Sequence, residues 1–162
     1  DVSHIILPGV GAVGMYLQNL EETGFTHVIK KIVLNDMIPL LGICVGMQAL
    51  ATTCIEFGTY NGMNLILGTV KKIDRLSSHV KLPHIGWNQI NIVGVESLLS
   101  EVDNHDFYFV HSNHFDCEKE FVIAQSEYGI GFASIIGFRN IFGVQFHPEK
   151  SHFFGLKFLE TF

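Results

Sequence analysis

Hydrophobic positions in the first third of the chain form short continuous runs that alternate with runs of helical spacing. The continuous runs are typical of strands buried on both faces of a sheet, and the spaced runs of helices packed on that sheet. Strands are predicted over residues 3–7 and 39–43, and helices over 15–23, 26–34 and 46–57. Gly24 is placed to end the first of these helices, and Thr26 to cap the second. This alternation predicts an α/β fold with a parallel sheet.

The second part of the chain has a different pattern, dominated by short apolar segments. Strands are predicted over 70–76, 89–93, 107–112, 121–125, 132–136 and 141–146, with a hairpin turn at 137–140. Residues 152–162 have the spacing of a short closing helix, with Phe154, Leu156, Phe158 and Leu159 available to pack inward.

Composition narrows the possible classes of protein. The 162 residues fit one domain, 48% of them are hydrophobic, and the net charge of −6 comes without a basic stripe, which argues against nucleic-acid binding. No apolar run approaches the length of a membrane span. Three cysteines without CxxC spacing suit a reducing cytoplasm, and the nine histidines form no ligand set. We therefore expect a cytoplasmic protein without a metal or other cofactor.

Cys44 lies between two glycines, in the segment LGICVGMQAL (41–50). A buried free cysteine is the commoner role for such a residue. The spacing from Gly42 through Cys44 to Gly46 is also the cysteine version of the G-x-S-x-G elbow, where a sharp strand-to-helix turn presents a nucleophile. The helix start would favour the thiolate, and the N–H of Val45 would face a developing oxyanion.

Two other segments could complete a site around this thiol. His147 directly follows a predicted strand and precedes Glu149 by two positions, so a base and its orienting carboxylate could lie side by side. Alone, such a segment is more often an exposed turn. The glycine-rich residues 8–11 (PGVG) could bring backbone N–H groups over the thiol, or form an ordinary strand-to-helix turn.

Together these segments resemble the class I (triad) glutamine amidotransferases. The matching stretches are ILPGVGA (6–12), LGICVGMQ (41–48), LPHIGWNQI (82–90), FYFVHS (107–112) and GVQFHPEKS (143–151). The motifs PGVGA and PHIGWNQI narrow the resemblance to the glutaminase-subunit family of imidazole glycerol phosphate synthase. The resemblance implies a flavodoxin-like, mainly parallel sheet with helices on both faces, in one domain over 1–162.

The resemblance also implies an activity and a set of site residues. Glutamine would be hydrolysed to glutamate and ammonia through a thioester on Cys44, with His147 moving protons and Glu149 orienting it. The oxyanion positions would be Gly9, Val10 and Val45, and glutamine would be bound by Gln48, Glu56, His111 and Ser112. Glu56 could equally be a solvated carboxylate at a helix end.

A partner follows from the same resemblance. Trp87, Asn88, Tyr108 and Lys150 match positions that face a (β/α)₈-barrel synthase, which would take up the ammonia within a heterodimer. Trp87 could also be a core aromatic. The chain opens on Asp1 without the first strand and helix of the family, so we expect it to be N-terminally incomplete. The aromatic residue that often follows His-Ser is Asn113 here.

Three other functions remain open at this stage. A paralogous branch with the same glutaminase chemistry supplies ammonia to a sugar-amidating synthase for surface polysaccharide, and HPEKSHFFG and VHSNHF lean toward it. A cysteine hydrolase or peptidase could use Cys44 and His147 but would not need Gln48. A non-catalytic interaction protein would have no need of an intact triad.

Overall fold

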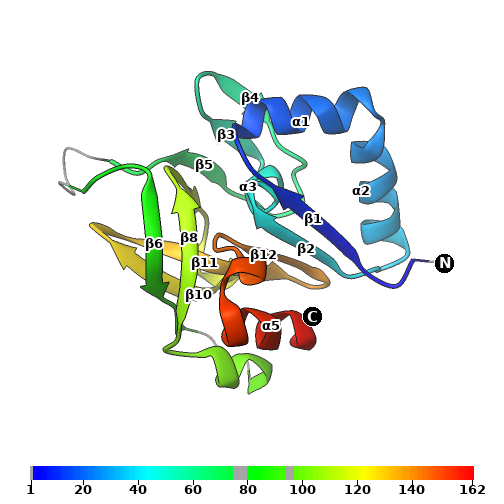
Figure 1. The fold of residues 1–162 in the computed structure, drawn as a ribbon. Coiled ribbons are helices and arrows are strands. Elements are labelled where there is room, and N and C mark those ends of the chain that lie inside the picture. Colours follow the sequence, from blue (N-terminus) through cyan, green and yellow to red (C-terminus); the bar gives the residue numbers. More distant parts are fainter. Residues whose placement is uncertain (1, 75–79, 94–96) are drawn as a thin grey trace.

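The computed structural model describes residues 2–74, 80–93 and 97–162 (Figure 1). The helices are α1 (Val13–Glu22), α2 (Phe25–Asn35), α3 (Val45–Ala49) and α5 (His152–Thr161). The strands are β1 (Ile5–Gly9), β2 (Leu40–Cys44), β3 (Thr53–Ile55), β4 (Thr59–Asn61), β5 (Thr69–Lys72), β6 (His84–Gln89), β7 (Asn91–Ile92), β8 (Asp106–His111), β9 (Asn113–Asp116), β10 (Val122–Tyr128), β11 (Ile130–Phe138) and β12 (Ile141–Val144). Short 3₁₀ turns cover Ser97–Val102, Lys119–Phe121 and Pro148–Lys150.

The central sheet has six strands within the described residues, in the order β1-β2-β12-β11-β10-β7. The pairs β1–β2 and β2–β12 are parallel, and the remaining pairs are antiparallel. The sheet is therefore mixed rather than mainly parallel. Strands β10, β11 and β12 follow one another through short turns, which can join only antiparallel neighbours. The parallel part is the one that carries Cys44.

Helices cover both faces of this sheet, as the α/β pattern predicted (Figure 1). A Cβ atom on Gly143 of β12 would lie 2.7 Å from Met47 of α3. The next residue back, Phe142, contacts Phe162 at the end of α5 with ring centroids 6.3 Å apart. Because successive strand residues point to opposite faces, α3 and α5 lie on opposite sides of β12.

Smaller sheets surround this core. Strands β4, β3, β5 and β9 form a four-stranded sheet, and β6 pairs with β8. The predicted helix over 46–57 is wrong beyond Ala49, because Thr53–Ile55 forms β3 between β4 and β5. Two of its three residues, Thr53 and Ile55, are β-branched and favour a strand.

Other boundaries also differ from the sequence pattern. The strand predicted over 70–76 is β5, and residues 75 and 76 lie outside the described residues. The strand predicted over 89–93 is split into the end of β6 and the short β7, and the one predicted over 141–146 ends at Val144. In α5, Phe158 is buried but Leu156 is 60% exposed, so its predicted inward packing is wrong. Leu156 and Phe158 are two positions apart, and residues at that spacing lie on nearly opposite sides of a helix.

The prediction that Gly24 ends the first helix, α1, is confirmed. Gly24 follows the C-cap Thr23 and has a φ of 75°, the left-handed conformation that glycine adopts without strain. Thr26, by contrast, is not the N-cap of α2. That helix begins one residue earlier, at Phe25, so that only Thr23 and Gly24 separate the two helices.

Candidate active site

Cys44 lies at the junction of β2 and α3 in a strained backbone conformation, with φ 53° and ψ −107°. A Cβ atom on Gly46 would lie 1.8 Å from the carbonyl oxygen of Leu7, and one on Gly42 would lie 2.6 Å from the carbonyl oxygen of Gly46. Neither position can hold a larger side chain without a backbone shift. The sharp strand-to-helix turn predicted from the two glycines is therefore present.

A cavity of about 190 Å³ opens beside this turn. It brings together most of the predicted nucleophile, oxyanion and substrate positions, which come from four separate parts of the chain. Its lining consists of Val10, Gly11, Cys44, Val45, Gln48, Glu56, Pro83, Val110, His111, Ser112 and Asn113. A larger, open groove between α1, α2 and β4 contains none of these residues.

The Cys44 sulfur is protonated at neutral pH in this state. Burial above all, together with the negative charge of Glu149, raises the pKa of the thiol to about 11. The N–H of Val45, the charge of Lys150 and the amide of Gln145 act in the opposite direction on the pKa but do not outweigh burial. The expected thiolate is thus not found, because Cys44 is buried and α3 has only five residues to contribute a dipole.

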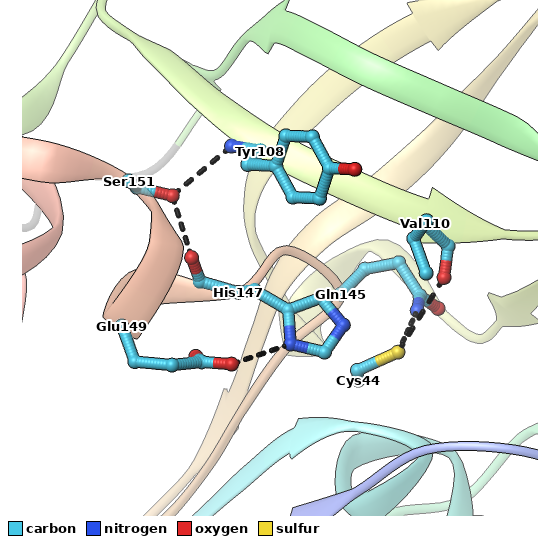
Figure 2. Close-up of polar contacts among 7 residues, drawn as sticks. All are labelled: Cys44, Tyr108, Val110, Gln145, His147, Glu149 and Ser151. Carbon is cyan, nitrogen blue, oxygen red and sulfur yellow. Dashed lines mark hydrogen bonds and ion pairs between the residues drawn. The ribbon is translucent and has the colours of Figure 1, made fainter.

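His147 and Glu149 form the base–carboxylate pair that their spacing suggested. The Nδ1 of His147 lies 2.8 Å from Oε1 of Glu149 (Figure 2). A carboxylate on Nδ1 holds the proton there, so that Nε2 is left as an acceptor. Nε2 is buried and has no hydrogen-bond partner in the described part of the chain. It is therefore free to take up a proton.

Backbone bonds hold His147 against β8. Its N–H donates to the carbonyl oxygen of Tyr108 at 2.9 Å. The hydroxyl of Ser151 donates to the carbonyl oxygen of His147 at 2.6 Å and accepts from the N–H of Tyr108 at 3.0 Å (Figure 2). These bonds fix the main chain on both sides of the imidazole, so its approach to the cavity is set by the fold.

Gln48 and Glu56 both reach the cavity, although only Gln48 is on a helix. Gln48 is buried on α3, and its Nε2 donates to the carbonyl oxygen of Asn113 at 3.4 Å. Glu56 follows β3 and is half-buried. Its Oε2 accepts from the N–H of Val13 at 2.7 Å, and its Oε1 accepts from Nδ2 of Asn113 at 2.6 Å. Glu56 is thus not a freely solvated carboxylate.

His111 and Ser112 line the opposite wall at the end of β8. The ring of His111 is buried, with Nδ1 2.8 Å from the carbonyl oxygen of Asn113 and Nε2 3.0 Å from Nδ1 of His84. Because the carbonyl can only accept, Nδ1 of His111 carries its proton and Nε2 accepts from His84. Burial lowers the pKa of His111 to about 3 and that of His84 to about 4.

The two proposed oxyanion positions at the end of β1, Gly9 and Val10, differ in their relation to the cavity. Gly9 pairs in register with Cys44 across the parallel strands, which places the end of β1 directly beside the nucleophile. Val10 follows it, lines the cavity and is 72% exposed. A Cβ atom at Gly9 would lie 2.9 Å from Tyr16 and 3.0 Å from the N atom of Gly46, so this close approach requires glycine.

Three of the four predicted partner positions, Trp87, Tyr108 and Lys150, lie together, away from the cavity lining. Trp87 on β6 is 47% exposed, so it is not a core aromatic. Its ring stacks on His152 with centroids 5.0 Å apart and meets Tyr108 edge-on at 5.9 Å. Lys150 lies over the Tyr108 ring, with its Nζ 6.0 Å from the ring centroid. Asn88 instead donates to the carbonyl oxygen of Glu127 at 2.9 Å.

The sequence pattern predicts no role for two residues of the site. Asn113 stands where an aromatic residue often follows His-Ser, yet it contacts Gln48, Glu56 and His111. Gln145 is fully buried, and its amide contacts the Cys44 sulfur. An amide side chain inside the apolar run 141–146 was the available signal, since buried polar groups need partners.

This arrangement combines a thiol on a strained turn, an imidazole held by a carboxylate and a cavity lined by polar side chains. Over residues 2–161 the sequence matches the family described as class-I glutamine amidotransferases. The chain belongs to the class-I glutamine amidotransferase family. It is similar to the imidazole glycerol phosphate synthase subunit HisH 1 of Campylobacter jejuni, at 43% identity over 159 residues, which cover 98% of this chain and 79% of that protein.

A second relative gives nearly the same figures. The HisH subunit of Leptospira borgpetersenii is 42% identical over 162 residues, covering 98% of this chain and 79% of that protein. Two solved amidotransferase structures share the fold at low sequence identity. One has a TM-score of 0.70 at 18% identity and covers 99% of this chain and 79% of that chain. The other, from Thermotoga maritima, has a TM-score of 0.65 at 20% identity and covers 98% and 61%.

Neither a cluster of metal-ligating side chains nor a membrane-spanning helix is found within the described ranges of this amidotransferase. No group of three or more His, Cys, Asp or Glu side chains there could hold a metal ion. No helix there is long and apolar enough to cross a membrane.

Proposed function

We propose that this amidotransferase is the glutaminase subunit of an imidazole glycerol phosphate synthase, releasing ammonia from glutamine for histidine biosynthesis. The observation that carries the proposal is the cavity in which Cys44 lies beside Gln48 and Glu56. A carboxylate and an amide in one small cavity suit the charged and polar ends of an amino acid. The names of the relatives described above support the same acceptor pathway.

The reaction follows from the groups around Cys44. The Cys44 sulfur would pass its proton to Nε2 of His147 and attack the side-chain amide carbon of glutamine. The imidazolium, held by Glu149, would return the proton to the leaving nitrogen, so that ammonia departs and a thioester remains on sulfur. Water activated by His147 would then release glutamate. The N–H groups of Gly9, Val10 and Val45 are the proposed oxyanion donors.

The raised thiol pKa gives the reaction a particular starting point. With the sulfur protonated at neutral pH, attack must be coupled to proton transfer to His147, rather than begin from a standing thiolate. A partner that eases this proton transfer would raise glutaminase activity.

We further propose that the partner is a (β/α)₈-barrel synthase bound as a heterodimer in the cytoplasm. Free ammonia is mostly protonated at neutral pH and is then no nucleophile, so it needs a shielded passage to its acceptor. The surface of Trp87, Tyr108 and Lys150 is the proposed contact, with Asn88 beside it. We also propose that residues 1–162 form a single domain.

The test is thioester formation with labelled glutamine in the presence of the barrel synthase. Mass spectrometry of the acid-quenched protein should show a γ-glutamyl adduct on Cys44, and Cys44→Ala should lose both adduct and turnover. Cys117→Ser is the matched control, because Cys117 lies outside the cavity lining. Persistent turnover in Cys44→Ala would disprove the glutaminase assignment.

The acceptor is tested separately from the chemistry. Activation of glutaminase turnover by a liganded imidazole glycerol phosphate synthase barrel is the expected result. Activation by a sugar-amidating synthase alone would favour the polysaccharide branch, which the similarity to HisH subunits does not favour. A peptidase would cleave peptide substrates with no need for Gln48.

A further inference from the structure

Gln145 is a fully buried amide next to the nucleophile. It follows β12, and its backbone N–H donates to the carbonyl oxygen of Ser134 at 3.0 Å. Its Nε2 donates to the Cys44 sulfur at 3.7 Å, and its Oε1 accepts from Nε2 of Gln48 at 3.1 Å. Figure 2 shows the Gln145 amide and the Val110 carbonyl both directed at this sulfur. A buried amide in this position is well placed to act on the reacting atom.

The orientation of this amide follows from its neighbours. The carbonyl oxygen of Asn113 can only accept, so the group of Gln48 that faces it must be the NH₂. The same NH₂ also faces Gln145, which must therefore present its oxygen there. Its own NH₂ is then left to face the sulfur. The flipped amide would set NH₂ against NH₂ at one end and oxygen against sulfur at the other.

The contacts of the sulfur differ in which protonation state they stabilise. The carbonyl oxygen of Val110, at 3.7 Å, accepts from the S–H and so stabilises only the thiol. The N–H groups of Val45 and Gln145 donate to the sulfur, and a donor bonds more strongly to an anion than to a neutral thiol. These donors favour the state that attacks.

Several charged or titratable groups also act on the sulfur. Glu149 and Lys150 affect the thiol pKa with opposite signs, and the ring of His147 is the proposed proton acceptor. His111 lies across the cavity and is neutral at pH 7, because burial lowers its pKa to about 3. Gln145 has no titratable proton in this range, so its effect on the thiol pKa is the same at every pH at which the protein is folded.

We propose that Gln145 is a further catalytic residue, whose side-chain amide donates to the Cys44 sulfur and stabilises the thiolate, with Gln48 holding it in that orientation. When the S–H proton passes to Nε2 of His147, the electron pair stays on sulfur and the Gln145 bond strengthens. The proposal deepens the glutaminase mechanism proposed above and rests on it. Gln48 thereby connects the substrate cavity to the nucleophile, besides any contact of its own with glutamine.

The test measures the thiolate fraction of Cys44 without substrate, because below the thiol pKa of about 11 the alkylation rate is proportional to that fraction. The rate at which iodoacetamide alkylates Cys44 is followed from pH 7 to pH 10, with mass spectrometry separating this thiol from Cys54 and Cys117. In Gln145→Met, which keeps length but has no donor, we expect the pKa to rise by about one unit and alkylation in this range to slow about tenfold. Gln125→Met, an exposed position on β10, is the matched control and should behave as the unmodified protein.

Activity gives a second readout. In Gln145→Met we expect kcat to fall about tenfold while KM for glutamine changes little, because the lost bond acts on the nucleophile. An unchanged pKa in a folded Gln145→Met protein would overturn the proposal. If thermal melting shows that this variant does not fold, Gln145→Leu decides. Its side chain also lacks the donor and carries no charge, so an alkylation profile like that of the unmodified protein would overturn the proposal.

The two proposals fail in different ways. The alkylation measurement needs neither glutamine nor a partner, so a shifted thiol pKa in a protein without glutaminase turnover would leave the Gln145–Cys44 contact standing and remove the proposed function. Turnover that is lost in Cys44→Ala but unaffected in Gln145→Met would do the reverse.

Discussion

Asn113 holds Glu56 by a hydrogen bond of 2.6 Å from Nδ2 to Oε1, across 57 positions of the chain. The second carboxylate oxygen of Glu56 accepts from the backbone N–H of Val13 at 2.7 Å. Both oxygens are therefore fixed at the cavity before any substrate arrives. A carboxylate held in this way is suited to bind the α-amino group of glutamine without first losing its own conformational freedom.

Removing this bond should weaken substrate binding more than catalysis. In Asn113→Leu, Glu56 keeps only the bond from Val13, and we expect KM for glutamine to rise about tenfold, the size of a lost charge-assisted bond. The backbone carbonyl of Asn113, which serves Gln48 and His111, remains in place. Steady-state kinetics check this, with the exposed Asn61→Leu as control. A fall in kcat at constant KM would contradict this role of Asn113.

The His147–Glu149 pair predicts an ordered series of losses. His147→Asn removes the proton acceptor and should lower kcat about 10²- to 10⁴-fold, the usual contribution of a general base. Glu149→Gln should lower it less, because the Glu149 side chain is 50% exposed and water can partly replace it on Nδ1. Single-turnover measurement of thioester formation separates the two variants. Equal losses would mean that Glu149 does more than orient the ring.

Gly46 predicts an effect on folding rather than on chemistry. A Cβ atom there would lie 1.8 Å from the backbone oxygen of Leu7, which cannot rotate away. We expect Gly46→Ala to lower the free energy of unfolding by ~1–3 kcal/mol or more, because overpacking a protein core typically costs this much. In Gly131→Ala the added Cβ would meet no atom within 4 Å, so this variant is the matched control. Urea unfolding compares the two, and equal midpoints would show that the turn can relax.

The nucleophile turn could be predicted from the sequence because its requirement is local. The two glycines around Cys44 indicate that no side chain fits at these positions, and the close approach of backbone atoms at Gly42 and Gly46 agrees. The end of α3 could not be predicted in the same way. Residues 46–57 continue a helical pattern, but after Ala49 the chain forms β3 instead, whose Cys54 pairs with Tyr60 in a hairpin and with Val70 on the more distant β5.

The residues of the site show the same difference between contacts that are local in the sequence and contacts that are not. His147 and Glu149 are two positions apart, so their contact was visible as spacing. The bonds of Asn113 to Glu56 and of Gln145 to Cys44 join residues 57 and 101 positions apart. No local pattern encodes them. The lowered reactivity of the resting thiol was missed for a similar reason, because burial depends on the whole fold and here it outweighs the single helical turn of α3.

His84 and His111 predict how stability depends on pH. Burial lowers the pKa of His84 to about 4 and that of His111 to about 3, whereas both titrate near 6.5 in an unfolded chain. Between these values the unfolded chain binds more protons than the folded one. The contribution of this pair to the free energy of unfolding should therefore be fully present above pH 6.5. It should be lost as the pH drops from 6.5 toward 3.

A single variant isolates this contribution. His84 stacks on Tyr128 with ring centroids 3.9 Å apart, so His84→Phe keeps an aromatic ring in the same space while removing one titrating group. We expect the drop in Tm between pH 7 and pH 4.5 to become smaller than in the unmodified protein. His27→Gln, on the exposed side of α2, should leave that drop unchanged. The comparison is of the slope with pH, because losing the bond to His111 lowers Tm at every pH. If His84→Phe melts with the same pH dependence as the unmodified protein, the buried pair is not what sets its acid sensitivity.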